Sequence, residues 1–164
     1  MARGRGGYTF VELLVVIAIL AVLFAVGLNT YRKARWRAQV RDGLMTLSAT
    51  LREARSTAQR FNVSARVRFT GPRTFFLEVK DRLGHTYRSY RRELPAYLEL
   101  DYTKNGVTWR SPSVLGVVTY SAPFGETSAS STLFRVRHSR DRRIAACLRI
   151  VGVTGKVVLA RACP

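Results

Sequence analysis

The chain has 164 residues and a formal net charge of +18, because 28 lysines and arginines stand against 10 acidic residues. Apolar residues make up 47% of it, which excludes an intrinsically disordered chain, and two cysteines exclude a disulfide-rich scaffold. The length suits one domain with an appendage, and the charge calls for a polyanionic partner, an anionic membrane surface or arginine-rich codon usage.

An apolar run begins at Phe10 and ends at Leu28, and Glu12 is its only charged residue. As a helix, a run of this length spans roughly 30 Å, the thickness of the hydrocarbon core of a bilayer. A secretory signal would have a shorter apolar region and a small-residue cleavage site, and a helix of a soluble domain would be amphipathic. We therefore expect a membrane-embedded helix over residues 8–29, in which Glu12 requires a partner from another chain or from the N-terminus.

The sequence GGYTFVELLV at residues 6–15 closely resembles the class III signal of type IV prepilins and pseudopilins. In that family a prepilin peptidase removes a short basic leader after a glycine and methylates the new N-terminal residue. The resemblance implies that the leader, residues 1–7, is removed by a cut between Gly7 and Tyr8, and that Tyr8 is N-methylated. Tyrosine stands here where phenylalanine is usual.

The same resemblance gives Glu12 a role in assembly, because it falls at the fifth mature position, where the family has a glutamate. There the carboxylate pairs with the N-terminal amine of a neighbouring subunit, and neither charge is tolerated alone in a medium of low dielectric constant. The implied partners are other pilin or pseudopilin subunits, the peptidase and, before assembly, inner-membrane lipid.

Two features of the sequence imply opposite orientations for the membrane helix. Five basic residues follow the apolar run against two in the leader, and the positive-inside rule would place the C-terminal part in the cytoplasm: Arg32, Lys33, Arg35, Arg37 and Arg41. The prepilin resemblance implies the opposite. We expect a single-pass inner-membrane protein with a periplasmic C-terminal domain, which later lies in a pilus filament at the cell surface.

Residues 30–61 continue the helix as an amphipathic segment. Their apolar residues are spaced alternately by four and three positions, which is one stripe of a helix and is typical of core packing: Val40, Leu44, Leu47, Leu51, Ala54, Ala58 and Phe61. Gly27 and Gly43 are positions where the helix could bend.

Residues 62–164 have the alternating pattern of half-buried strands, so the fold class is α+β, a long N-terminal helix packed on an antiparallel sheet. Gly71-Pro72 predicts a hairpin between the first two strands, and residues 121–132 predict a mobile polar loop. The expected strands are Val63–Phe69, Phe75–Val79, His85–Arg92, Tyr97–Tyr102, Val114–Tyr120, Leu133–His138, Ile144–Val151 and Lys156–Ala162.

The C-terminal segment resembles that of the GspH/FimT branch of pseudopilins and minor pilins, in the stretch from Cys147 through residues 155–158 to Cys163. This branch includes type II secretion pseudopilins and type IV minor pilins, some of which bind DNA during natural transformation. Members that bind DNA through the tail have a Gly-Arg-x-Arg motif. The present sequence has Gly155-Lys156-Val157-Val158, which keeps one cation and loses the other.

Cys147 and Cys163 are the only cysteines. In an oxidising compartment they would form a disulfide, and a loop of this size would stabilise the domain by about 3 kcal/mol and hold the C-terminal strand. Two free thiols are the alternative. A metal site is not expected, because two cysteines do not complete a tetrahedral shell and the histidines have no supporting spacing.

Residues 132–164 contain eight basic residues and one acidic residue, and they are the candidate DNA-binding segment. Arginine forks suit phosphate oxygens, so binding would be independent of base sequence and steeply salt-dependent. On a strand, Arg135 and Arg137 would be exposed on one face. A solvated basic face is the alternative. The candidate ligands are Arg135, Arg137, Arg140, Arg142, Arg143, Arg149, Lys156 and Arg161.

No catalytic constellation is recognisable, so we expect no enzyme, no cofactor and no small-molecule substrate. Three functions remain: a minor pilin that assists pilus assembly and takes up DNA in natural transformation, a type II secretion pseudopilin that serves protein export, and a structural subunit that primes a pilus.

Overall fold

The computed structural model describes residues 10–81, 83–127, 129–160 and 162–163. The chain divides into two compact units, Met1–Trp36 and Arg37–Pro164. The helix α1 (Phe10–Phe61) belongs to both and continues through Gly27 and Gly43 without interruption. The expected cleavage site at Gly7 and Tyr8 lies outside the described residues.

In the first unit, the described part of α1 is long and apolar enough to cross a membrane, and none of that apolar stretch is buried within the chain. Its side chains from Phe10 to Val26 present large apolar groups that are about half exposed or more. Apolar area of this extent is unfavourable in water. This surface therefore requires lipid or other protein around it.

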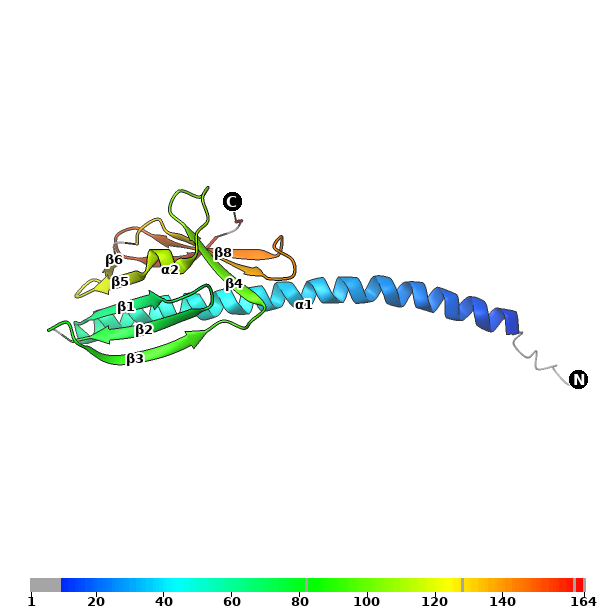
Figure 1. Cartoon of the computed structure of the whole chain (residues 1–164), viewed down its shortest axis with the longest axis horizontal. Coiled ribbons are helices and arrows are strands. Elements are labelled where there is room, and N and C mark those ends of the chain that lie inside the picture. The colour runs from blue at the N-terminus through cyan, green and yellow to red at the C-terminus, as the bar shows by residue number, and fades with distance from the viewer. Residues whose placement is uncertain (1–9, 82, 128, 161, 164) are drawn as a thin grey trace, which may run out of the picture. The chain divides into compact units, whose positions relative to one another are not determined.

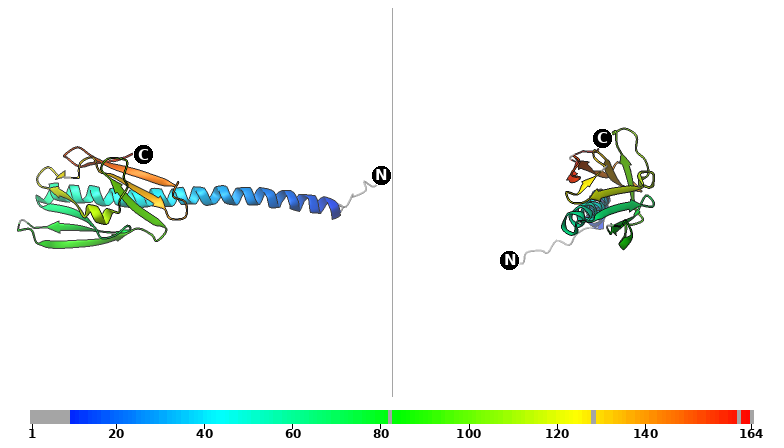
Figure 2. Two further views of the ribbon diagram at one scale, coloured as in Figure 1. Left: turned by 45° about the horizontal axis from the view of Figure 1, so that its top comes forward. Right: turned by 90° about the vertical axis from the view of Figure 1, so that its left-hand side faces the viewer.

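The second unit has two antiparallel sheets packed with the C-terminal part of α1 (Figures 1 and 2). The first sheet has the strand order β3-β2-β1-β5-β6 and the second has the order β4-β7-β8-β9. The strands are β1 (Ser64–Phe69), β2 (Thr74–Lys80), β3 (Thr86–Glu93), β4 (Leu98–Thr103), β5 (Val117–Ser121), β6 (Glu126–Thr127), β7 (Leu133–His138), β8 (Ala145–Val151) and β9 (Lys156–Leu159).

The predicted apolar stripe of α1 is the centre of the core. From Val40 to Ala58 its members are buried, and they pack with alternate residues of both sheets, such as Val67 and Leu77 in the first and Leu100 and Val136 in the second. The prediction is wrong for Phe61, which is 60% exposed at the last residue of the helix. The α+β class and the β1–β2 hairpin are confirmed.

One expected strand begins differently. Residues 112–115 form a short helix, α2 (Pro112–Leu115), instead of the start of a strand at Val114. Proline favours the first position of a helix because its fixed φ suits the turn, and Gly116 ends the helix with a positive φ of 73°. The expected loop at residues 121–132 also contains the two-residue strand β6, which pairs with β5.

Cys147 on β8 forms a disulfide with Cys163, with an S–S distance of 2.10 Å. The backbone N–H of Ala160 also donates to the carbonyl of Cys147, at 2.9 Å. The segment after β9 is therefore attached to β8 both covalently and through the backbone.

Gly43 is a close-packing position rather than a bend. A Cβ atom there would lie 2.5 Å from Leu98 Cδ1 and 3.4 Å from Val136 Cγ1, both from the second sheet. The helix can approach β4 and β7 this closely only because residue 43 has no side chain. At Gly27, by contrast, an added Cβ would have no neighbour within 4 Å.

We expect Gly43→Val to lower the free energy of unfolding of the second unit by about 1–3 kcal/mol, because added atoms in a packed core displace their neighbours. Thermal unfolding of the full chain in a non-ionic detergent measures this. Gly27→Val is the matched control and should leave the same transition unchanged. Equal melting temperatures for the two variants would contradict the close packing at Gly43.

Candidate functional site

The basic residues of the C-terminal segment do not form one surface. The turn between β7 and β8 carries Arg140, Arg142 and Arg143, whereas Lys156 follows the turn after β8. β8 has seven residues and rises about 3.3 Å per residue, so the two turns are separated by roughly 20 Å. Figure 1 shows them at opposite ends of the second sheet.

The exposure expected for Arg135 and Arg137 is wrong. Both project from the outer face of β7, but their side chains are only 19% and 21% exposed. The register places Arg137 opposite Glu99 and Arg135 opposite Asp101 on β4. Arg135 pairs with Asp101 at 2.9 Å, and Arg137 pairs with Glu99 at 3.0 Å.

Two further contacts hold this cross-strand ladder. Arg137 Nε lies 3.2 Å from Asp101, and the guanidinium of Arg135 lies over the ring of Trp109, 3.9 Å from its centroid. The Arg135 and Arg137 charges are therefore compensated by neighbouring carboxylates, and an incoming phosphate would have to compete with them.

The turn between β7 and β8 remains as an exposed cationic site. Arg140, Arg142 and Arg143 are exposed, and none of the ion pairs in the described part of the chain involves them. The carboxylate of Asp141 accepts a hydrogen bond from the backbone N–H of Arg143, at 3.1 Å, which fixes the turn. Three arginine side chains thus extend from one short, ordered turn.

His138 adds no charge to this turn at neutral pH. It is buried at the end of β7 and stacks on Tyr97, with 5.8 Å between the ring centroids. Burial lowers its pKa below the ordinary value and the neighbouring Arg140 lowers it further, while Asp141 acts in the opposite direction. Its Nδ1 accepts a hydrogen bond from the backbone N–H of Arg140, which positions the first arginine of the turn.

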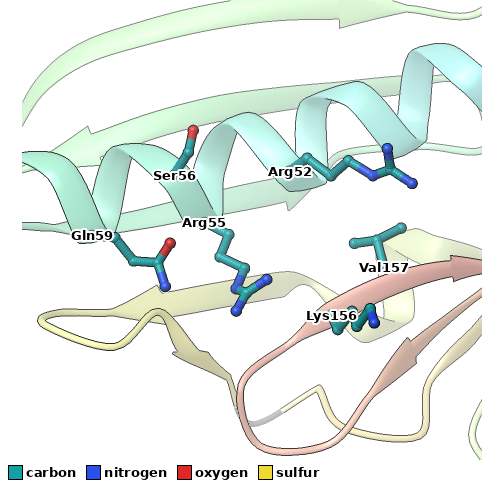
Figure 3. A pocket seen from close by; sticks show the side chains of 6 residues that line it. All are labelled: Arg52, Arg55, Ser56, Gln59, Lys156 and Val157. Carbon is teal, nitrogen blue, oxygen red and sulfur yellow. The ribbon is translucent and has the colours of Figure 1, made fainter.

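The remaining candidates are dispersed. Arg149 is exposed on β8, between Leu133 and Val158 in register, and no described arginine or lysine is its direct partner there. Lys156 lies instead beside Arg52 and Arg55 of α1 (Figure 3). Arg161 lies outside the described residues. The sequence does not associate Lys156 with Arg52 and Arg55, because they are about a hundred positions apart along the chain.

Arg66 and Arg68 of the first sheet are compensated by a carboxylate, as Arg135 and Arg137 of the second sheet are. Glu78 on β2 is buried on the outer face of the sheet and accepts hydrogen bonds from Arg66 and Arg68 on β1, the latter at 2.7 Å. Burial opposes ionisation of Glu78, but the hydrogen bonds and charges of the two arginines outweigh it, so its pKa lies below the ordinary value. Arg66 and Arg68 are therefore not free to form a cationic patch.

Residues 2–28 match the prokaryotic N-terminal methylation motif. The chain is similar in structure to the minor pseudopilin EpsH from the type II secretion system of Vibrio cholerae, with a TM-score of 0.57 and 11% identity over 75% of this chain and 94% of that one. It is also similar to the type IV minor pilin FimU of Pseudomonas aeruginosa, with a TM-score of 0.52 and 16% identity over 78% of this chain and 97% of that one. No curated protein matches it in sequence.

The chain thus combines the N-terminal motif of type IV pilins and pseudopilins with the fold of a minor pseudopilin. The α+β arrangement, a long helix with antiparallel sheets, is the one expected from the sequence.

The Glu78 ion pairs generate a prediction for stability. Glu78→Gln should lower the free energy of unfolding by about 1.5–3 kcal/mol at pH 7, because two charge-assisted hydrogen bonds to a buried carboxylate are weakened. The folded-state pKa is below the unfolded value of 4.5, so this contribution is complete at neutral pH and is lost as the pH falls from about 4.5 through the folded-state pKa.

Chemical unfolding of the full chain in detergent between pH 3 and pH 7 measures the difference between wild type and variant. Glu93→Gln is the matched control, because Glu93 and its partner Arg91 are both more than half exposed. A wild-type advantage over Glu78→Gln that stays constant across this pH range would contradict the assignment.

Proposed function

We propose that this chain is a minor pilin or pseudopilin that is cleaved after Gly7, N-methylated at Tyr8 and assembled with other subunits of a type IV pilus or a related secretion filament. The observation that carries the proposal is the methylation motif at residues 2–28 on a chain with a minor pseudopilin fold. The precursor lies in the inner membrane through the apolar part of α1, with the second unit in the periplasm. It needs no cofactor and carries out no catalysis.

Glu12 is the residue that directs assembly in this proposal. It is the only acidic residue between Phe10 and Leu28, in a segment whose other side chains favour lipid or protein contact. A carboxylate in such surroundings is stabilised by a nearby cation, and the methylated N-terminal amine of a neighbouring subunit is a cation at the matching depth. The interaction would be complete only when the subunits are in register.

A second part of the proposal concerns DNA. The turn arginines Arg140, Arg142 and Arg143 contact the phosphates of incoming DNA without reading its bases, which favours a pilus used in natural transformation. The support is their exposure and the absence of ion pairs to them among the described residues. Arg135 and Arg137 are left out of this contact, because they are engaged with Glu99 and Asp101.

The alternative within the same class is a pseudopilin of type II secretion, which the similarity to EpsH favours. A deletion strain separates the two. Loss of DNA uptake with normal export of folded proteins supports the transformation pilus, and loss of export with normal transformation supports the secretion machine.

For assembly, we expect Glu12→Val to insert in the inner membrane at the wild-type level and to be absent from sheared filaments, because the subunit loses the charge that holds its register. Membrane fractionation and immunoblotting of sheared filaments measure both. Asp42→Asn, which removes an exposed acid from the same helix outside the apolar segment, should assemble normally. Glu12→Val in filaments at the wild-type level would refute the proposal.

For DNA, we expect reversal of Arg140, Arg142 and Arg143 to glutamate to abolish a gel shift of the full chain in non-ionic detergent at 50 mM salt. Reversal of the exposed residues Arg60, Lys104 and Arg88 changes the net charge equally and should keep most of the binding. The wild-type shift should weaken steeply as salt is raised. No wild-type shift at 50 mM salt, or equal losses in the two triple variants, would disprove the contact.

A further inference from the structure

We propose that a groove between α1 and β9 is a binding site for a phosphate group, held by Arg52, Arg55 and Lys156 (Figure 3). The groove lies wholly within the second unit and is remote from the turn arginines along β8. None of the three cations of the groove belongs to the β7–β8 turn, so this site is independent of the proposed DNA contact there. Free phosphate, a nucleotide or the backbone of a nucleic acid would supply the same chemical group.

The groove has a volume of about 280 Å³, and its lining contains three cations and no carboxylate. Glu53 is the acidic residue nearest to Arg52 and Arg55 in the sequence of α1, but it pairs with Arg92 of β3, at 3.8 Å, and does not line the groove. Six residues line the groove: Arg52, Arg55, Ser56, Gln59, Lys156 and Val157. Guanidinium forks and an ammonium group around one cavity suit the several oxygens of a phosphate.

Arg55 is the central ligand. Its Nε atom is buried and has no hydrogen-bond partner among the described residues. A buried donor without an acceptor is unfavourable, and native structures seldom keep one. Figure 3 shows the Arg55 side chain extending from α1 toward the strands, on the side where Lys156 and Val157 lie. A phosphate oxygen in the groove would provide an acceptor for the guanidinium.

Tyr120 lies close to Arg55 and is another buried donor without an acceptor among the described residues, as Thr132 Oγ1 and Arg135 Nε also are. Its side chain is fully buried, and no described group hydrogen-bonds to its hydroxyl. Burial raises the pKa of Tyr120, and the nearby Arg55 guanidinium only partly opposes this, so the hydroxyl keeps its proton at neutral pH. Tyr120 is therefore a neutral group packed near Arg55, outside the lining of the groove, and it adds no negative charge that would compete with an anion for Arg55.

The position of Arg55 is fixed by close backbone contacts. A Cβ atom at Gly125 would lie 2.9 Å from Arg55 Cγ, and one at Gly155 would lie 2.5 Å from Tyr120 Cε1. Both glycines have positive φ, which a side chain would disfavour in any case. Gln59 Nε2 donates to the carbonyl of Phe124, at 2.9 Å, and holds this loop against the helix. A guanidinium held in this way loses little freedom when an anion binds.

Isothermal titration of the full chain in non-ionic detergent, at pH 7 and constant ionic strength, tests the site with inorganic phosphate, a mononucleotide and a short single-stranded oligonucleotide. We expect the double variant Arg55→Gln/Lys156→Gln to bind inorganic phosphate at least tenfold more weakly than wild type. The control Arg60→Gln/Arg88→Gln removes the same charge from exposed positions outside the groove and should stay within twofold.

If the double variant does not fold, Arg52→Gln alone keeps the test available, because Arg52 is an exposed side chain at the groove. It should weaken phosphate binding at least threefold. The turn variant with Arg140, Arg142 and Arg143 reversed should bind inorganic phosphate as wild type does, which separates this site from the proposed DNA contact.

The relative affinities for inorganic phosphate, the mononucleotide and the oligonucleotide identify which kind of molecule supplies the phosphate group. Tighter binding of the oligonucleotide than of phosphate, lost in the double variant, assigns the groove to a nucleic-acid backbone, and equal binding of phosphate and mononucleotide assigns it to a small ligand. Equal losses in the double variant and its control, or a glutamate-rich peptide binding more tightly than any phosphate probe, would overturn the proposal.

Discussion

The structure of residues 37–164 depends on the burial of one face of α1 against two antiparallel sheets. The buried residues recur every three or four positions from Val40 to Ala58, and both sheets place alternate residues on them. Because the inner faces of both sheets pack on this stripe, the charged residues lie on the outer faces of the strands and in the turns. The charges on the strands and turns of this unit are therefore positioned by the same packing that holds its fold.

This dependence explains what the sequence could predict. The helical period of the stripe and the two-residue period of the strands are local signals, and they identified α1 and nearly all the strands of the sheets. The irregularities were missed where a single residue overrides the pattern, as Pro112 and Gly116 do at the start of β5. Phe61 was assigned to the core by its spacing, but it is the last residue of the helix and its side chain is 60% exposed.

The candidate sites depend on the order of the strands in the sheets, and the periodicity of the sequence does not predict that order. Arg135 and Arg137 alternate along β7 as expected, yet their partners are Glu99 and Asp101 on β4, and only the pairing of β4 with β7 brings these residues together. The same is true of Lys156, which meets Arg52 and Arg55 because β9 runs beside α1. A count of charge along the sequence therefore groups the turn arginines with Lys156, although β8 separates them in the structure. It does not group Lys156 with the α1 arginines, although they line the same groove.

The positions of the acidic residues bear on the origin of the basic charge. If the excess of arginine reflected codon usage alone, acidic partners would have no reason to lie beside some arginines and not others. Glu78 and Asp101 each pair with two arginines on an outer sheet face, Glu99 pairs with Arg137 alone, and each of these carboxylate side chains is at most about one-third exposed. The β7–β8 turn and the groove beside Lys156 show no such compensation among the described residues. Carboxylates neutralise the arginines on the outer faces of β1 and β7, whereas no ion pair in the described part of the chain involves the arginines of the β7–β8 turn or the cations of the groove. That contrast, rather than the net charge of +18, is the physical reason to expect an anionic partner at those two regions.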